Sequence, residues 1–180
     1  MERLIIDTDP GVDDAHVILL ALAHPDVKAE SITTLNCKLN LDLTTANALK
    51  ILYAAGRDVP VYRGCDRQLF NCVENTVLVH GEDGLGDCNI PASKNAVQSE
   101  HAVHVLIHMA NENPGGLTLA VIGPLTNLAV ALSIDPDPPS KFKRLVIMGG
   151  AIYGKGNAKT VTSQFNIHTD PEAAHMVFSA

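Results

Sequence analysis

Apolar and polar positions follow two different rhythms along the chain. Short runs rich in β-branched residues are apolar almost without interruption, which is typical of strands covered on both faces of a parallel sheet. These runs are "RLIID" (3–7), "AESITTL" (29–35), "LTLAVIG" (117–123) and "RLVIMGG" (144–150). We therefore predict a buried strand at each of them.

Segments with apolar residues at helical spacing lie between and after these strands. They are "DDAHVILLALAHP" (13–25), "TTANALKILYAAG" (44–56), "SEHAVHVLIHMANENPGG" (99–116), "PLTNLAVALSI" (124–134) and "DPEAAHMVFSA" (170–180). Acidic residues open the first, Gly56 closes the second and Pro124 opens the fourth, as is usual at helix ends. The alternation predicts an α/β protein with an open, mostly parallel, Rossmann-like sheet flanked by helices.

Length and composition narrow the class of protein further. The 180 residues suit one domain, in which the Gly-, Asp-, Asn- and Cys-rich segment 62–97 is expected to be an irregular loop region. A net charge of −7 without a basic run argues against nucleic acid, and no stretch is apolar enough to span a membrane. Without a signal peptide or paired CxxC cysteines, we expect a cytoplasmic protein with reduced thiols.

Four aspartates crowd the segment that follows the first predicted strand. In "IIDTDPGVDD" (5–14) they are Asp7, Asp9, Asp13 and Asp14. Carboxylates so close together repel one another unless a positive charge lies among them or some of them stay protonated. A divalent cation supplies that charge, and oxygen ligands favour Ca²⁺, Mg²⁺ or Mn²⁺ over zinc. The alternative is one helix-capping aspartate with solvated neighbours.

Six segments in order resemble the inosine–uridine-preferring nucleoside hydrolase family. They are "DTDPGVDDA" (7–15), "SITT" (31–34) with "TTANALKIL" (44–52), "HGEDGLGD" (80–87), "IGPLTNLA" (122–129), "VIMGGA" (146–151) and "QFNIHTDPEAA" (164–174). The resemblance implies the nucleoside hydrolase fold and hydrolysis of the N-glycosidic bond of ribonucleosides such as inosine or uridine. The products would be ribose and the free base, and the cofactor would be Ca²⁺.

The resemblance also implies a role for individual residues. Asp9 and Asp14 would bind the metal together with the backbone carbonyl of Ile122, and Asp9 would act as general base on a calcium-bound water. Asp7 would support these ligands from behind. Asp13 would hold a ribose hydroxyl. The other residues expected to bind substrate are His80, Met148, Asn157, Gln164 and Asn166.

Without the resemblance, three of these residues have ordinary structural explanations. Asn157 would be a turn residue, Met148 a core residue and His80 a loop cap. The histidines His101, His104 and His108 share one helical face, but no set of carboxylates or cysteines supports a metal site there. The histidines expected to be structural are His16, His24, His168 and His175.

The chain departs from the family pattern in three places. Lys38 in "LNCK" replaces the asparagine of a V-A-G-N stretch, and Asn36 or Asn40 is a candidate to compensate. Gln164 replaces the glutamate of E-F-N. Family members continue beyond Ala180 with another metal-binding aspartate, so we expect residues 1–180 to form one nucleoside hydrolase domain that is incomplete at its C-terminus. A homo-oligomer is expected if the fold is complete.

Two other functions stay open at this point. A shortened relative of these enzymes could bind nucleosides, or a full-length relative, without turnover; Lys38 and Gln164 favour this alternative. The "DTD" after a strand is also found in magnesium-dependent phosphatases of the haloacid dehalogenase type. Pro10 and Gly11 after the second aspartate argue against that assignment.

Overall fold

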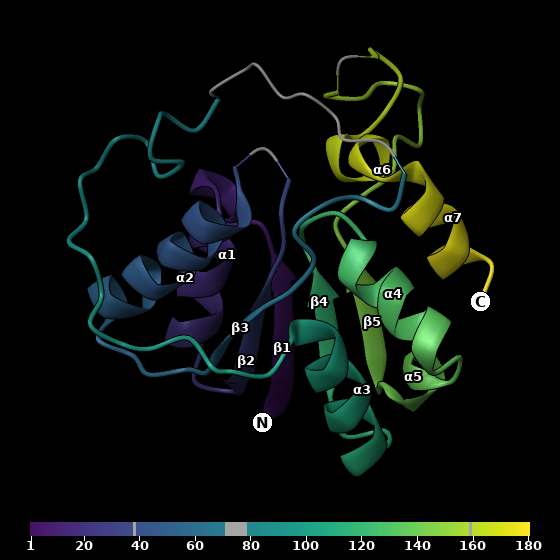
Figure 1. The fold of residues 1–180 in the computed structure, drawn as a ribbon, viewed down its shortest axis with the longest axis horizontal. Helices are drawn as coiled ribbons and strands as arrows, with labels where there is room; N and C mark the ends of the chain where they lie inside the picture. Colours follow the sequence, from purple (N-terminus) through teal and green to yellow (C-terminus); the bar gives the residue numbers. More distant parts are fainter. Residues whose placement is uncertain (38, 71–78, 159) are drawn as a thin grey trace.

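Five parallel strands form one sheet at the centre of the molecule (Figure 1). The computed structural model describes residues 1–37, 39–70, 79–158 and 160–180. The strands are β1 (Glu2–Thr8), β2 (Val27–Thr34), β3 (Val61–Arg63), β4 (Thr118–Val121) and β5 (Arg144–Ile147), in the spatial order β3-β2-β1-β4-β5. The predicted open parallel sheet is therefore confirmed. The three-residue strand β3 was not predicted.

Helices cover both faces of this sheet. On one face lie α1 (Val12–Ala23) and α2 (Leu41–Ala55); on the other lie α3 (Ala102–Glu112), α4 (Thr126–Ile134) and α7 (Pro171–Phe178). All five correspond to predicted helices. The short helices α5 (Pro138–Lys141) and α6 (Phe165–Thr169) were not predicted, because four or five residues are too few to show a period.

Adjacent residues of β1 belong to two separate hydrophobic cores. Ile5 packs with Leu106 and Leu128 on the α3 and α4 side, whereas Ile6 packs with Ile18 and Leu52 on the α1 and α2 side. Successive side chains of a strand point to opposite faces, so a strand buried on both faces must be apolar throughout. This explains the uninterrupted apolar runs of the sequence.

The helix ends follow from short polar side chains and from glycine. Asn40 caps α2 by accepting a hydrogen bond from the Leu43 N–H at 2.9 Å, and Gly56 ends the helix with a φ of +61°. Asp170 caps α7 through the Ala173 N–H at 3.1 Å, and Pro171 occupies the first position. These caps fix where each helix begins relative to the strand ends.

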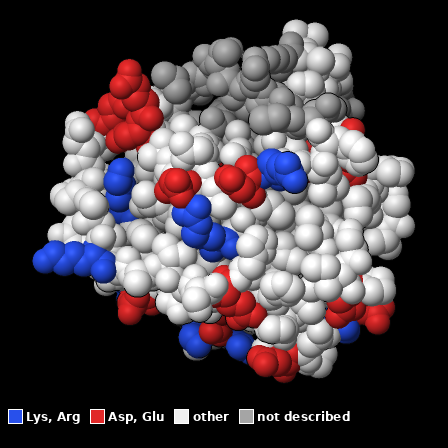
Figure 2. All heavy atoms as spheres, in the orientation of Figure 1, with Lys and Arg blue, Asp and Glu red and all other residues white. Residues whose placement is uncertain are grey.

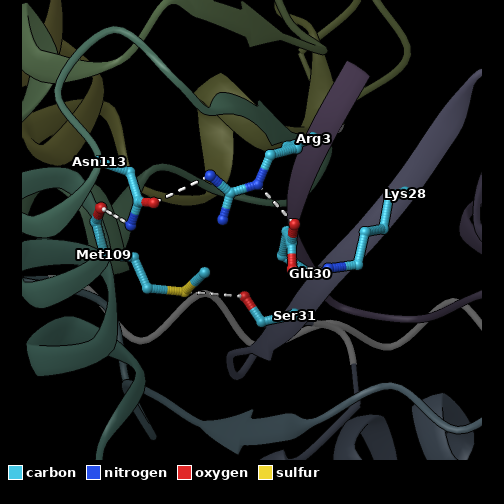
Figure 3. A network of polar contacts seen from close by, with 6 residues as sticks. All are labelled: Arg3, Lys28, Glu30, Ser31, Met109 and Asn113. Atoms are coloured by element: carbon cyan, nitrogen blue, oxygen red, sulfur yellow. Dashed lines mark hydrogen bonds and ion pairs between the residues drawn. The ribbon is translucent and has the colours of Figure 1, made fainter. Parts of the chain in front are cut away.

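A polar network joins β1 and β2 to the C-terminal end of α3 (Figure 3). Arg3 Nε donates to Glu30 Oε1 at 2.6 Å, and Arg3 Nη1 donates to Asn113 Oδ1 at 2.9 Å at the end of α3. Lys28 Nζ donates to the other Glu30 oxygen at 2.9 Å. Burial opposes ionisation of Glu30, but the hydrogen bonds from Arg3 and Lys28 outweigh it and lower the pKa of this carboxyl.

The surface carries charges of both signs. On the face that Figure 2 shows, acidic and basic side chains lie interspersed among uncharged ones. No helix within the described residues is long and apolar enough to cross a membrane. Among the described residues, Cys37, Cys65 and Cys88 form no disulfide.

Candidate active site

The aspartate cluster lies where the order of strands reverses. The chain runs from β1 outwards to β2 and β3, then returns to β4 beside β1 and continues outwards to β5. The Ile122 N–H donates to the Asp7 carbonyl at 2.8 Å, so the ends of β1 and β4 are held side by side. In open α/β sheets, ligands bind at the carboxyl ends of the strands at this reversal.

Asp14 ties the turn after β1 to the first turn of α1. Its Oδ1 accepts a hydrogen bond from Thr8 Oγ1 at 2.7 Å, and its Oδ2 accepts one from the Gly11 N–H at 3.0 Å. Burial raises the pKa of Asp14 to about 6, against these two hydrogen bonds, which lower it. The carboxyl is thus held rigidly at the start of a helix, whose dipole also favours a negative charge.

Asp9 lies beside the backbone that follows β4. A Cβ placed on Gly123 would lie 2.7 Å from Asp9 Oδ1, so only glycine allows this approach between the two strand ends. Burial and then the neighbouring Asp14 carboxylate raise the pKa of Asp9 well above its ordinary value, while a hydrogen bond from the Cys37 thiol opposes the rise. A positive charge nearby would therefore favour the ionised form of Asp9.

Asp7 is fully buried and does not line the cavity. Its Oδ1 accepts hydrogen bonds from Thr33 Oγ1 at 2.5 Å and from Asn127 Nδ2 at 2.8 Å. Within the described residues, its Oδ2 has no hydrogen-bond partner. Burial raises the pKa of Asp7 to about 6 despite the two hydrogen bonds. The sequence predicted Asp7 as part of the site but did not predict Asn127. An amide in the first turn of an otherwise apolar helix is a signal for such a buried contact.

Three amide side chains, those of Asn157, Gln164 and Asn166, form another part of the site, which we call the amide wall. Asn157 Oδ1 accepts a hydrogen bond from the Phe165 N–H at 2.8 Å, and Gln164 Oε1 accepts one from the Ile167 N–H at 3.1 Å. Asn166 instead donates from Nδ2 to the carbonyls of Ile122 at 2.6 Å and Met148 at 3.0 Å. Asn166 therefore connects this wall directly to the end of β4.

A third side of the site comes from the loop that carries His80. His80 Nε2 lies 3.5 Å from Asp13 Oδ1, and its ring covers Gly11, on which a Cβ would come within 2.9 Å of His80 Cδ2. His80 thus contacts the aspartate turn from a segment distant in sequence. The structure places this histidine against the acidic turn.

These side chains enclose a cavity of about 360 Å³, within the size range of small-molecule sites. It brings together nine of the ten predicted site residues, since all except Asp7 line it. Gly11, Leu39, Val79 and Phe165 also line the cavity and were not predicted as site residues. The lining residues are Asp9, Gly11, Asp13, Asp14, Leu39, Val79, His80, Ile122, Met148, Asn157, Gln164, Phe165 and Asn166.

The structure describes only part of the "LNCK" segment (35–38). Lys38 lies outside the described residues. The neighbouring Cys37 is buried and bonds to Asp9, and its Sγ lies 3.8 Å from Thr169 Oγ1. Asn40 is used as the cap of α2, and Asn36 does not line the cavity. Neither asparagine therefore replaces the expected amide there.

The histidine stripe on α3 serves structural roles. His101 Nδ1 accepts a hydrogen bond from the Val103 N–H at 3.3 Å at the start of the helix. His108 Nδ1 lies 2.7 Å from Glu100 Oε1, and the ring centroids of His104 and His108 are 6.4 Å apart. Nowhere in the described part of the chain do three or more His, Cys, Asp or Glu side chains converge as a metal centre.

The residues at the strand reversal nevertheless suit a hard divalent cation in part. They offer the carboxylates of Asp9 and Asp14 and the Ile122 carbonyl, all oxygen donors. The raised pKa of Asp9 and the orphaned Oδ2 of Asp7 both indicate a negative site that lacks a positive charge. These three oxygen donors therefore fit such an ion chemically. Only two of them, Asp9 and Asp14, are carboxylates.

Fold and cavity together indicate an α/β enzyme site at a strand reversal, and comparison with known proteins identifies its family. The model of the inosine-uridine preferring nucleoside hydrolases matches residues 4–180. The chain belongs to this family.

Two relatives and one solved structure illustrate the similarity. The chain is 40% identical to the probable uridine nucleosidase 2 of Arabidopsis thaliana over 181 residues, covering 99% of this chain and 56% of the relative. It is 40% identical to the inosine-uridine preferring nucleoside hydrolase of Crithidia fasciculata, covering 99% and 57%. A plant nucleoside hydrolase, the PpNRh1 enzyme, superposes with a TM-score of 0.92 at 38% identity, covering 98% and 56%. The chain thus spans a little over half the length of these relatives.

Proposed function

We propose that the cavity at the strand reversal hydrolyses the N-glycosidic bond of ribonucleosides, with inosine and uridine as the first substrates to test. The observation that carries this proposal is the meeting of Asp9 and Asp14 with the amide wall in one cavity of about 360 Å³. Membership of the nucleoside hydrolase family supports it. That membership also leaves the phosphatase alternative without support.

The reaction adds water to C1′ of the ribose and releases the base with a proton. Asp9 is proposed as the general base, because its carboxyl lines the cavity and burial raises its pKa above the ordinary value. A raised pKa makes a carboxylate a better proton acceptor. Positive charge develops on the sugar during glycosidic cleavage, and the neighbouring carboxylates stabilise it.

The ribose is proposed to lie between the acidic turn and the amide wall. Asp13 would accept a hydrogen bond from one hydroxyl, and Asn166 Oδ1 from another, since the Asn166 amino group is already bound to two carbonyls. Met148 is 41% exposed and offers the cavity an apolar surface for the sugar ring. His80 would close the cavity over the acidic turn.

Nucleoside hydrolases are metal-dependent, and Ca²⁺ is our proposed ion. Asp9, Asp14 and the Ile122 carbonyl would hold it, with Asp7 behind them. When bound, the ion would supply the positive charge that these carboxylates lack and help to orient the attacking water. The roles of the protein side chains described above do not depend on which divalent ion is present.

The test is release of ribose from inosine and uridine by the purified chain, with Ca²⁺ or with a chelator. We expect hydrolysis with Ca²⁺ and a loss of about 100-fold or more in Asp9→Asn. Asp137→Asn is the matched control, because it makes the same change at an exposed aspartate outside the cavity. Equal activity of Asp9→Asn and Asp137→Asn would contradict the proposed base.

Binding without turnover is the result that would favour the second function. Calorimetry would then show that the chain binds inosine while no ribose appears. The lack of a disulfide at Cys37, Cys65 and Cys88 within the described residues is compatible with the proposed cytoplasmic location. A homo-oligomer remains our proposal for the assembled protein, and sedimentation measurements test it.

A further inference from the structure

The outward face of α3 carries histidine at each exposed position of its first turns. Between Ala102 and Ala110, the exposed residues are His104 and His108, and the other positions are buried or half-buried. The two histidines are four residues apart, so they are neighbours on one face of the helix. Their ring centroids are 6.4 Å apart and their ring planes are inclined by 34°. This face lies on the α3 and α4 side of the sheet, whereas the aspartate turn leads into α1 on the other side.

The structural contacts of these two histidines leave ring nitrogens unused. His108 Nδ1 lies 2.7 Å from Glu100 Oε1. Because an ionised carboxylate can only accept, His108 donates from Nδ1, and the lone pair of its neutral ring lies on Nε2. Within the described residues, His104 makes no hydrogen bond through its side chain and contacts only neighbouring rings. One face of α3 therefore offers two imidazole nitrogens to a ligand.

Glu100 gives His108 the environment that metal-binding histidines usually have. A carboxylate on one ring nitrogen fixes the tautomer and the ring orientation, and it makes the other nitrogen a better metal ligand. The sequence does not indicate this pairing, because Glu100 precedes the helix and lies eight positions before His108. The structure thus brings to the histidine stripe a carboxylate that sequence spacing alone did not place there.

His101 belongs to the same stripe but is committed to another role. Its Nδ1 accepts a hydrogen bond from the Val103 N–H at 3.3 Å and so caps the start of α3. In the neutral ring the proton is then on Nε2, which leaves no lone pair for a metal. The His101 and His104 rings meet edge to face, with centroids 6.4 Å apart. The pair that can act together is therefore His104 and His108.

A small movement brings this pair to a single ion. Imidazole nitrogens bind Zn²⁺ at about 2.0–2.1 Å, which places two rings on one ion with centroids about 5 Å apart. The observed separation of 6.4 Å must therefore shorten by about 1 Å. His104 is exposed and breaks no hydrogen bond when it turns, and exposed side chains change rotamer readily. His108 can keep its contact with Glu100 throughout.

We propose that His104 and His108 form a binding site for a divalent transition metal ion, with Glu100 as the positioning residue behind His108. Imidazole nitrogen suits Ni²⁺, Cu²⁺ and Zn²⁺, unlike the oxygen donors of the aspartate turn. Within the described residues no cluster of three or more His, Cys, Asp or Glu is formed, so water completes the coordination. The site lies outside the cavity, and the inference does not rest on the proposed function.

The test is calorimetric titration of the tag-free chain with Ni²⁺. Excess Ca²⁺ occupies the proposed hard-ion site, and prior treatment with iodoacetamide blocks the exposed Cys88. We expect one Ni²⁺ to bind per chain. His104→Gln and His108→Gln each leave a single imidazole, so each should weaken binding about 100-fold or more. Glu100→Gln should weaken it about tenfold, because it removes the charge that orients His108 and strengthens it as a ligand.

Two matched variants serve as controls. His101→Asn removes the neighbouring imidazole of the stripe, while asparagine can still cap the helix. His175→Gln removes an exposed histidine from α7. Both should keep the wild-type affinity for Ni²⁺. The replaced side chains are exposed, so circular dichroism and metal-free melting temperatures of His104→Gln and His108→Gln should match those of the wild type.

Melting temperature supplies a second measurement. Ni²⁺ should raise it in the wild type and in both controls, because the ion binds the folded state, but not in His104→Gln or His108→Gln. Wild-type protein that binds no Ni²⁺, or equal affinity in His104→Gln, His108→Gln and His175→Gln, would overturn the inference. Unchanged affinity in Glu100→Gln would overturn the role of Glu100. Release of ribose is measured separately, so none of these results decides the proposed function.

Discussion

Asn127 Nδ2 donates to Asp7 Oδ1 at 2.8 Å, joining the first turn of α4 to the end of β1 beneath the cavity. The same amide donates to the Thr34 carbonyl at 3.2 Å and accepts from the Cys65 N–H at 2.8 Å. One fully buried side chain therefore connects α4, β1, the end of β2 and the segment after β3. Asn127 therefore supports the elements that surround Asp7.

Replacing Asn127 is expected to destabilise the fold strongly. Asn127→Ala would leave buried polar groups on Asp7 and Cys65 without this partner, which costs roughly 2–4 kcal/mol of unfolding free energy. Urea denaturation measures the loss. Asn95→Ala, at an exposed asparagine outside the cavity, is the control and should change stability by less than about 0.5 kcal/mol. Similar losses in the two variants would contradict this role.

The metal-free chain is expected to become less stable as pH rises from about 4 to above 6. Asp7 has a folded-state pKa of about 6, raised from 3.8 by burial, so the folded state keeps a proton that the unfolded state releases in this range. The stabilisation is complete below pH 3.8 and is lost as pH passes 6. Asp14, also at about 6, acts in the same direction.

Asp7→Asn isolates the contribution of this carboxyl. Unfolding free energies are measured in chelator at several pH values between 4 and 8. The variant should lose up to about 3 kcal/mol of the wild-type pH dependence, because a carboxyl shifted by about two pKa units contributes that amount. An identical pH profile in both proteins would show that Asp7 does not titrate in this window.

Added Ca²⁺ is expected to raise the melting temperature at pH 7.5. Ligand binding to the folded state alone adds about 2.7 kcal/mol at a concentration 100 times Kd. Asp9→Asn and Asp14→Asn should remove most of the shift, since each removes a carboxylate of the proposed site. Asp137→Asn should keep it. Wild-type protein whose melting temperature is insensitive to Ca²⁺, Mg²⁺ and Mn²⁺ would rule out a metal site in this chain.

Gly123→Ala is expected to disable the site with a modest cost in stability. The new Cβ would lie 2.7 Å from Asp9 Oδ1 and 3.1 Å from Asp9 N, so the carboxylate must move. A displacement of about 1 Å can lower turnover about 100-fold. Gly116→Ala is the control, because its Cβ meets nothing closer than 3.3 Å. Ribose release decides between them; full activity in Gly123→Ala would refute the close approach.

The rate at which each thiol is alkylated is expected to be lower the more deeply the thiol is buried. Burial, and then the charges of Asp7 and Asp170, raise the pKa of Cys65 to about 12, so this thiol stays protonated and unreactive at pH 8. Cys37 is buried, whereas Cys88 is exposed. Iodoacetamide followed by peptide mass spectrometry should therefore label Cys88 well before Cys65 or Cys37. Faster labelling of Cys65 than of Cys88 would contradict the structure.

The sequence predicts much of this fold because strands such as Glu2–Thr8 are buried on both faces, and because caps such as Asp170 mark the helix starts. It does not show β3, whose three residues are too few for a pattern and which pairs with β2, or α6, whose five residues depend on the Gln164 cap. The aspartates can be predicted as site residues because they lie so close together in the sequence. Leu39, Val79 and Phe165 do not, because an apolar residue in the sequence gives no sign of facing a cavity and not a core.

The sequence also does not show how the side-chain amides of the site are oriented. Glutamine at position 164 suggests a weakened acceptor for a sugar hydroxyl when only its identity is known. The structure shows that its oxygen already accepts the Ile167 N–H. Which half of an amide a ligand meets depends on neighbours that tertiary structure alone supplies.

The segment that carries His80 leaves and rejoins the sheet at almost the same place. Tyr62 of β3 forms an isolated bridge with Gln98, and the Gln98 N–H donates to the Val61 carbonyl at 2.9 Å. Insertions or deletions between these anchors can therefore be absorbed without displacing the strands that carry the aspartates. The side of the cavity that carries His80 can therefore change in sequence and length independently of the side that carries the aspartates.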